Sequence, residues 1–559
     1  MPKSAPKQQF AKNAVVILKS RLRLSGLIVA ITAFSFAMTP SLLPRPPIYM
    51  GAIAGVAAGL GYGFGILLAW FFNRYISVKI PSKVLNWLWY VVPAAGFLLV
   101  VLMTIVGTRW QNDVRSLVGE EDLGGRPIFA IFASALIFAG LVIVIGRFLR
   151  IFNRSIRHLL IKIMPGKAAA LLGVAVVIVL AFLLVKGVAY NAFIHVAKST
   201  YSSRNASTPE GIKQPTSMYV SGGEGSLVPW NSLGYMGKKF AARVPDPSLI
   251  SAWSGQPAKS QIRAYAGVLS ADTPEARAKL ALDELKRTGA FSRRYLVVAT
   301  ATGTGWIEPQ TADAIAYLTN GDSAIAAIQY SYLPSWISML VDSKNATDAG
   351  KALYDTVYDY WRTLPADSRP QLIAYGLSLG SYGGQAAFSG LSDFQQRSQG
   401  ALYVGSPSGS SLWSEFTDRR DKGSPEILPV YGGGEHVRFA ARNTDITQNT
   451  DIWQTPRLLY LQHPSDSVVW FSSDLIFNKP DWLKEPRGYD VAKSMQWIPV
   501  VTFLQVTVDQ FFGTTVPNGH GHNYGDITVS AWESILENMA WSQQQQNQLS
   551  EKIAAYPIE

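Results

Sequence analysis

The fold of this chain is indicated most clearly by the stretch Gln371-Leu-Ile-Ala-Tyr-Gly-Leu-Ser-Leu-Gly-Ser-Tyr-Gly-Gly384. Its apolar half predicts a strand, which ends in Gly376-Leu-Ser-Leu-Gly380, and small residues then begin a helix. This G-x-S-x-G pattern is typical of a nucleophile elbow, a strained turn whose flanking positions must be glycine to avoid collisions. We therefore predict that Ser378 is a nucleophile at the rim of a sheet. The alternative is a glycine-rich turn with a solvent-facing serine.

Composition narrows the class of protein. The 559 residues are 48% hydrophobic and 16% charged, and the net charge is +12. Residues 1–190 hold 20 Lys and Arg against 4 Asp and Glu, whereas the remainder holds 30 against 34. Because the basic excess coincides with long apolar runs, it indicates membrane topology and argues against nucleic-acid binding. Cysteine is absent, which excludes disulfides, thiol catalysis and cysteine-based metal sites.

The N-terminal third predicts a helical membrane domain over residues 25–190, after a basic segment at 1–24. Its apolar runs approach the roughly 20 residues that a helix needs to cross a bilayer. We predict about five spans, at residues 25–43, 50–72, 87–107, 127–146 and 168–189. A cleaved signal peptide is the alternative for the first run, but further runs follow it and no small-residue cleavage site ends it.

Basic residues in the connections predict the orientation. Fifteen Lys and Arg fall in the N-terminal segment and in the connections after the second and fourth runs, against four in the opposite loops. The positive-inside rule then places the N-terminus in the cytoplasm. With an odd number of spans, the chain after about residue 190 lies outside the plasma membrane.

The rest of the chain predicts a linker or strap over residues 191–260 and an α/β-hydrolase domain over 261–559. The linker is rich in Ser, Gly and Pro, and it could follow the membrane surface or cover the next domain as a lid or strap. From residue 261, strands alternate with helices, which indicates a mostly parallel sheet covered on both faces. The predicted strands are 262–269, 295–301, 324–330, 372–377, 401–405 and 458–462.

A serine nucleophile needs a base and an acid, and in this fold the acid and then the histidine follow the serine along the chain. Asp466 follows the last predicted strand and is our predicted acid. The base is predicted in Gly519-His-Gly-His522, where we favour His522 over His520 because Tyr524 and the final helix follow it closely. A zinc site shared by these histidines is an alternative, but it leaves the serine turn unexplained.

The oxyanion hole is predicted from two backbone segments. One donor is the N–H of Leu379, directly after the nucleophile, and the other comes from Thr302, Gly303 or Thr304 after an early strand. This chemistry needs no metal and no cofactor.

Six segments together resemble the actinobacterial membrane-anchored α/β-hydrolase family, which joins a multi-span N-terminal domain to a hydrolase domain. They are Thr39-Pro-Ser-Leu-Leu-Pro-Arg45, Thr302-Gly-Thr-Gly-Trp306, Gln329-Tyr-Ser-Tyr-Leu-Pro-Ser-Trp336, Gly376-Leu-Ser-Leu-Gly380, Tyr460-Leu-Gln-His-Pro-Ser-Asp466 and Gly519-His-Gly-His522. Leu377 stands where the family often has Glu, a position that the chemistry does not require. The resemblance implies roles for Ser378, Asp466 and the His520/His522 pair, but it implies no particular substrate.

The sequence predicts a membrane-anchored serine hydrolase that acts on acyl esters of envelope lipids. An acyltransferase would use the same covalent intermediate, with a sugar or protein hydroxyl in place of water. A non-catalytic membrane scaffold that keeps the hydrolase fold is the third hypothesis.

Overall fold

The computed structural model describes residues 22–76, 81–124, 127–447, 452–536 and 541–556. The chain divides into two compact units. Unit 1 contains the chain up to Asn191 together with Ser473–Leu483 and Val491–Phe512, and unit 2 contains Ala192–Ser472, Lys484–Asp490 and Gly513–Glu559. Two stretches of the predicted hydrolase domain, Ser473–Leu483 and Val491–Phe512, therefore pack with the helical unit.

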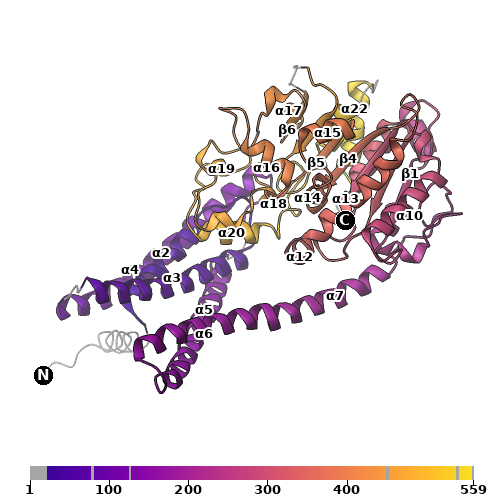
Figure 1. Cartoon of the computed structure of the whole chain (residues 1–559). Coiled ribbons are helices and arrows are strands. Elements are labelled where there is room, and N and C mark those ends of the chain that lie inside the picture. The colour runs from indigo at the N-terminus through magenta and orange to yellow at the C-terminus, as the bar shows by residue number, and fades with distance from the viewer. Residues whose placement is uncertain (1–21, 77–80, 125–126, 448–451, 537–540, 557–559) are drawn as a thin grey trace. The chain divides into compact units, whose positions relative to one another are not determined.

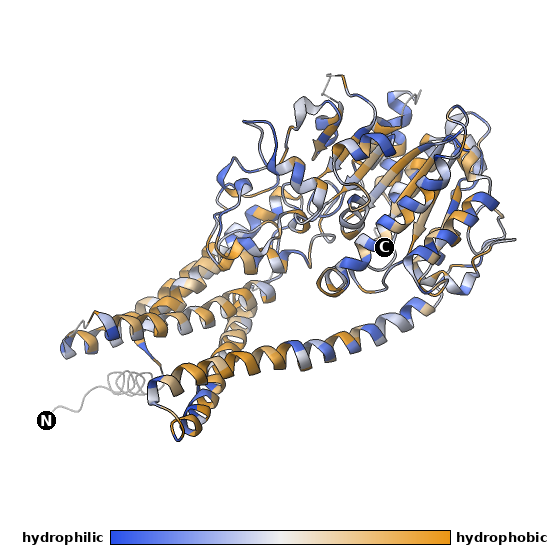
Figure 2. Cartoon of the chain, in the orientation of Figure 1, coloured by the Kyte–Doolittle hydropathy of each residue, from blue (hydrophilic) through white to orange (hydrophobic). Residues whose placement is uncertain are grey.

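Unit 1 is helical, as predicted, and its helices are mostly hydrophobic (Figure 2). Among the described residues, four helices are long and apolar enough to cross a membrane. They are α3 (Pro47–Tyr75), α4 (Ser82–Leu117), α5 (Pro127–Leu160) and a continuous helix Gly166–Ala206 that comprises α6 (Gly166–Leu183), the π-helical η1 (Leu184–Ala189) and α7 (Tyr190–Ala206). The basic stretch after the fourth run continues α5 as a helix up to Leu160.

The first predicted span is shorter than expected, so the structure gives four long helices where the sequence predicted about five spans. Helix α2 (Leu24–Ala37) has 14 residues. At about 1.5 Å per residue it measures roughly 21 Å, against about 30 Å of hydrocarbon. Pro40 and Pro44 explain why the helix stops, because proline removes an N–H donor and disfavours helical geometry in the residue before it.

Small residues hold the helices of unit 1 close together. An ideal Cβ at Gly51 would lie 2.2 Å from the carbonyl oxygen of Ile131 in α5, and one at Gly55 would lie 2.4 Å from that of Ala135. Gly65 meets α2 in the same way, 2.4 Å from the Ser25 carbonyl oxygen. This close backbone approach is the usual means of packing helices in a membrane.

The irregular segment between α2 and α3 is buried against a late part of the chain. Ser41, Leu42 and Arg45 are at most 1% exposed. The carboxylate of Asp509, at the end of α20 (Val501–Asp509), accepts hydrogen bonds from the Ser41 hydroxyl and the Leu42 N–H, and lies 3.6 Å from Arg45 Nε. Unit 1 is therefore closed by polar contacts between segments more than 450 residues apart.

Unit 2 is built on a parallel sheet of seven strands in the order β1-β3-β2-β4-β5-β7-β6 (Figure 1). The strands are β1 (Ile262–Ala266), β2 (Tyr295–Thr300), β3 (Ser323–Ile328), β4 (Gln371–Leu377), β5 (Gly400–Val404), β6 (Val437–Ala440) and β7 (Arg457–Leu461). Six of them match predicted strands, and β6 was not predicted. The predicted α/β-hydrolase architecture is confirmed.

Helices cover both faces of this sheet. Alternate residues of the central strands, such as Val297 and Tyr375, share one core with Ile315 of α11 and Trp532 of α21. Helices α10 and α13 pack together and against β2 and β3. The helices of unit 2 include α8 (Gly234–Ala242), α9 (Pro247–Ser254), α10 (Pro274–Arg287), α11 (Pro309–Leu318), α12 (Ser335–Val341), α13 (Ser343–Trp361), α14 (Leu379–Gln385), α15 (Leu391–Arg397), α16 (Ser411–Asp418), α17 (Asn443–Thr447), α18 (Ser467–Trp470), α21 (Thr528–Ile535) and α22 (Gln543–Ala554).

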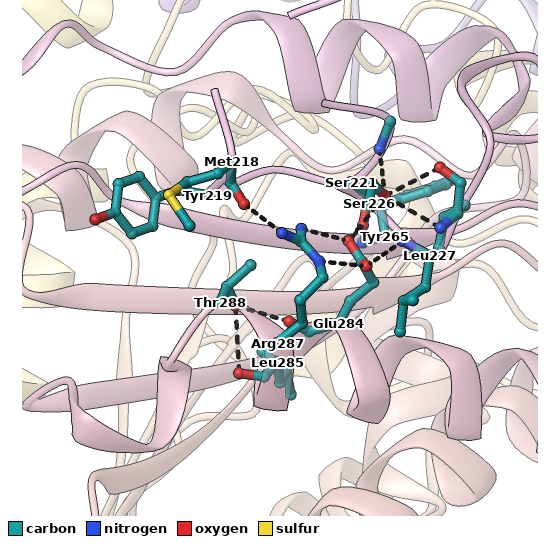
Figure 3. A network of polar contacts seen from close by, with 12 residues as sticks. Met218, Tyr219, Ser221, Ser226, Leu227, Tyr265, Glu284, Leu285, Arg287 and Thr288 are labelled. Carbon is teal, nitrogen blue, oxygen red and sulfur yellow. Dashed lines mark hydrogen bonds and ion pairs between the residues drawn. The ribbon is translucent and has the colours of Figure 1, made fainter. Parts of the chain in front are cut away.

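The stretch before β1 packs along the edge of the sheet as a strap. Val220 forms a parallel bridge with Arg263 of β1, which covers an otherwise open strand edge. The buried carboxylate of Glu284 in α10 then receives hydrogen bonds from Ser226, from the Leu227 N–H and from Arg287 (Figure 3). These contacts fix the strap to unit 2.

Candidate active site

Ser378 occupies a strained turn at the carboxyl end of β4. Its backbone angles are φ 56° and ψ −124°, values that a non-glycine residue adopts only under strain from its surroundings. An ideal Cβ at Gly376 would lie 2.4 Å from the Gly380 carbonyl oxygen, and one at Gly380 would lie 2.2 Å from that of Thr300. Both glycines are thus required by close approach, which is the steric reason for the motif.

Asp466 and His522 form a buried hydrogen-bonded pair. His522 Nδ1 lies 2.7 Å from Asp466 Oδ2. Asp466 directly precedes α18, and its Oδ1 accepts the N–H of Val468 at 2.8 Å. His522 Nε2, at the other end of the ring, is buried and has no hydrogen-bond partner among the described residues. With a proton on Nδ1, Nε2 carries the lone pair that accepts a proton from a nucleophile.

Gly405 brings this pair to the same end of the sheet as Ser378. An ideal Cβ at Gly405 would lie 2.4 Å from His522 Cε1 and 3.1 Å from Asp466 Oδ2. Gly405 directly follows Val404 of β5, whose carbonyl oxygen accepts the N–H of Ser378 at 2.8 Å. The three predicted residues therefore gather where the neighbouring strands β4, β5 and β7 end.

His520 has a different partner. Its Nδ1 lies 3.2 Å from Oδ2 of the buried Asp490, which also accepts the Ser465 hydroxyl at 2.6 Å. The Ser465 oxygen in turn accepts the N–H of Gly521 at 2.8 Å. His520 thus anchors the loop that carries His522, and the geometry favours His522 as the base.

Tyr524 makes a contact that sequence reasoning missed. Its hydroxyl donates to Asp466 Oδ2 at 2.6 Å, the oxygen that also faces His522, and it accepts the N–H of His463 at 3.1 Å. Burial, and next the nearby Asp466 charge, raise the pKa of Tyr524 well above its usual value, so the hydroxyl stays protonated. The sequence shows Tyr524 close to His522, but nothing in the spacing indicates a bond to Asp466.

His463 stiffens the same loop. Its ring stacks on that of Tyr524 with centroids 4.1 Å apart, and its Nδ1 lies 2.9 Å from the Gly521 carbonyl oxygen. Burial lowers the pKa of His463, so the ring is neutral and donates to that carbonyl. His463 therefore holds the loop that carries His522 in place, through Gly521 and Tyr524.

The predicted oxyanion segments lie beside the elbow. Leu379 is the first residue of α14, where helix N–H groups lack intrahelical partners. In the loop after β2, the N–H of Thr302 donates to the Trp306 carbonyl at 3.1 Å, which leaves Gly303 and Thr304 as the loop's better candidates. Gly380 packs on Thr300 and Ala301, and this contact brings the loop to the turn that holds Ser378.

The zinc alternative has no support from geometry. Among the described residues, no group of three or more His, Asp and Glu side chains is arranged to hold a metal ion. His520 and His522 each turn Nδ1 toward a different aspartate.

A parallel sheet with a strained serine after a central strand, and a His–Asp pair after later strands, defines an α/β-hydrolase. The chain belongs to the Alpha/beta-hydrolase family, whose profile matches residues 262–549. A second profile, described as the N-terminus of an alpha/beta-hydrolase family, matches residues 38–245. The predicted family membership is confirmed for both parts of the chain. Searches of curated proteins and of solved structures give no match.

Proposed function

We propose that this protein is a membrane-anchored serine hydrolase that cleaves acyl esters through a covalent intermediate on Ser378. The observation that carries the proposal is that the strained Ser378 and the buried His522–Asp466 pair lie at the same end of the sheet, where the neighbouring strands β4, β5 and β7 end. Family membership and the apolar helices support the broader class of membrane-associated hydrolase.

The reaction begins when Ser378 Oγ attacks the ester carbonyl carbon and His522 Nε2 takes its proton. Asp466 orients the ring and stabilises the resulting imidazolium. The N–H of Leu379 and the loop of Gly303 and Thr304 hold the oxyanion. The imidazolium then protonates the leaving alcohol, and water repeats the sequence in reverse to release the acid.

An outer-face location is part of the proposal. Counted with the adjoining helix ends, three basic residues lie around the α3–α4 connection and six lie from the end of α5 to the start of α6. The end of α4 and the α4–α5 connection hold two, Arg115 and Arg126, together with the acidic Glu120, Glu121 and Asp122. The positive-inside rule makes the α3–α4 and α5–α6 connections cytoplasmic, so α6 leads the chain outward into unit 2. This orientation follows from the four long helices, whether or not α2 crosses the membrane.

A second observation supports the same side. Asp509 belongs to a stretch inserted between Asp466 and His522, and it binds Ser41 and Arg45 just before α3 begins. That end of α3 is opposite to the end that enters the basic α3–α4 connection. A reporter fused after Glu559 should therefore report an extracytoplasmic C-terminus, and a cytoplasmic signal would refute the location alone.

Labelling with a fluorophosphonate probe tests the nucleophile. We expect the wild type to be labelled, Ser378→Ala to be unlabelled, and the exposed control Ser389→Ala to match the wild type. An unlabelled wild type would favour the scaffold hypothesis, and labelling that survives Ser378→Ala would assign the reactive group elsewhere. Product analysis with and without an added alcohol then separates hydrolysis from acyl transfer, the second use of the same intermediate.

A further inference from the structure

Helix α12 presents two different faces. Ile337 and Ser338 are buried at 2% and 0% exposure, and Ile337 packs with Leu333 and with Ala197 of α7. On the other face, three large apolar side chains remain exposed: Trp336 at 41%, Met339 at 37% and Leu340 at 71%. A seven-residue helix with this much exposed apolar surface needs an explanation, because such surface commonly marks a binding site.

The neighbouring helix α7 extends this apolar surface. Its Ile194, Ala197 and Tyr201 pack toward Leu333 and Ile337. Phe193 and Val196 stay exposed at 46% and 63%, and the Phe193 ring lies 6.1 Å from that of Trp336. We call Phe193, Val196, Trp336, Met339 and Leu340 the α7–α12 patch; all five belong to unit 2.

Helix α7 is also the C-terminal part of a helix that is long and apolar enough to cross a membrane. It continues the helix Gly166–Ala206, whose apolar run gives way to Lys186 and Tyr190, with the Lys186 ammonium 5.2 Å from the Tyr190 ring centre. Lysine, tyrosine and tryptophan together are typical of the zone where a helix leaves the bilayer. Phe193 lies seven residues beyond Lys186, which is about 10 Å along a helix.

We infer that the α7–α12 patch inserts into the lipid bilayer surface and delivers acyl chains to the catalytic site. The bilayer is the occupant because the patch is continuous with the helix that emerges from it and has the amphipathic composition of that zone. The substrate class is then a bilayer lipid with an acyl ester, and this part of the inference rests on the proposed function.

Helix α12 also adjoins the candidate oxyanion loop. An ideal Cβ at Gly303 would lie 2.7 Å from the Leu333 carbonyl oxygen and 2.9 Å from Ser338 Oγ. Tyr332, which packs against the buried side of α12, lines a small pocket together with Thr304 of that loop. A lipid held at the patch therefore has its headgroup esters close to the N–H groups that would polarise them.

Spin labelling tests the inserted surface without any measurement of activity. The full chain has no cysteine, so Leu340→Cys or Val196→Cys can be labelled singly with a nitroxide in proteoliposomes. We expect both labels to be relaxed more by oxygen than by a water-soluble nickel chelate. Leu249→Cys, on α9 and 55% exposed, is the matched control and should favour the chelate. Labels at 340 and 196 that behave like the control would overturn the inference.

A paired assay tests delivery. Turnover of dioleoylphosphatidylglycerol vesicles is compared with turnover of soluble p-nitrophenyl butyrate for the wild type, Leu340→Asp and Leu249→Asp. We expect Leu340→Asp to lower the vesicle-to-soluble turnover ratio about tenfold or more, and Leu249→Asp to leave it unchanged. An unchanged ratio in Leu340→Asp refutes delivery. If the labels at 340 and 196 are immersed in lipid but the wild type cleaves neither ester, the proposed function is refuted and the membrane-inserted surface is retained.

Discussion

Two fully buried aspartates, one in each unit, have opposite surroundings. In unit 2, Asp466 receives hydrogen bonds from the His522 ring, the Tyr524 hydroxyl and the Val468 N–H, none of which needs to carry charge. In unit 1, Asp509 faces the guanidinium of Arg45 at 3.6 Å and accepts from Ser41. Both carboxylates have no exposed surface.

The different surroundings suit the two buried carboxylates to different roles. A carboxylate surrounded by neutral donors keeps its charge available for an imidazolium that forms during reaction. A carboxylate next to a fixed cation has its charge already compensated, and such a pair ties chain segments together. Removing one member of a buried ion pair is costly because the other is left uncompensated.

The largest expected effect separates the two aspartates by activity. Asp466→Asn should lower kcat by about 10⁴-fold because the ring then loses the acceptor that fixes its tautomer, while the thermal unfolding temperature changes little. The measurement is turnover of p-nitrophenyl butyrate beside thermal unfolding in detergent. Asp490→Asn, next to His520, is the control and should lose far less activity; equal losses in the two variants would contradict the assignment.

Removing the carboxylate of Asp509 tests stability and not activity. Asp509→Ala should destabilise the protein by about 3–5 kcal/mol, because Arg45 then stays buried without its counter-charge. Thermal unfolding in detergent at pH 7 measures this loss. Arg45→Met combined with Asp509→Leu removes both charges and should recover most of the stability. A double variant less stable than Asp509→Ala would show that the pair is not coupled as described.

A smaller effect is expected from Tyr524→Phe, which sharpens the role of neutral donors at Asp466. The loss of one hydrogen bond to a carboxylate should lower kcat/KM by roughly tenfold. The thermal unfolding temperature, measured beside kcat/KM, should change little, whereas a merely structural role would lower it.

The smallest expected effect is the pH dependence of Asp509. Burial raises the pKa of this carboxyl, outside the membrane-spanning helices, from 3.8 to about 6, and Arg45 partly opposes the shift. The folded protein then binds this proton more tightly than the unfolded chain does. Its contribution to stability is present below about pH 4 and is lost as the pH rises through about 6. The stability of the wild type relative to Asp509→Asn, which has no proton to lose at this position, should therefore fall from pH 4 to pH 6, and a rise would contradict the shift.

The sequence predicted elements whose signals are local. The elbow follows from sterics around Ser378, since only glycine fits at positions 376 and 380. Six strands followed from apolar runs set between helical patterns, whereas β6, with four residues, was too short to register. The first predicted span came out as a 14-residue helix because hydropathy alone does not weigh the prolines that follow it.

By itself, then, the sequence determined the α/β-hydrolase class, the helical membrane region and the serine turn, because periodicity and backbone sterics act over a few residues. Tertiary contacts, in turn, are needed to show that His522 meets Asp466, that Tyr524 donates to the same oxygen, and that residues 491–512 pack in unit 1. These contacts join residues 56, 58 and 468 positions apart, and their geometry depends on how whole strands and helices pack rather than on any local pattern.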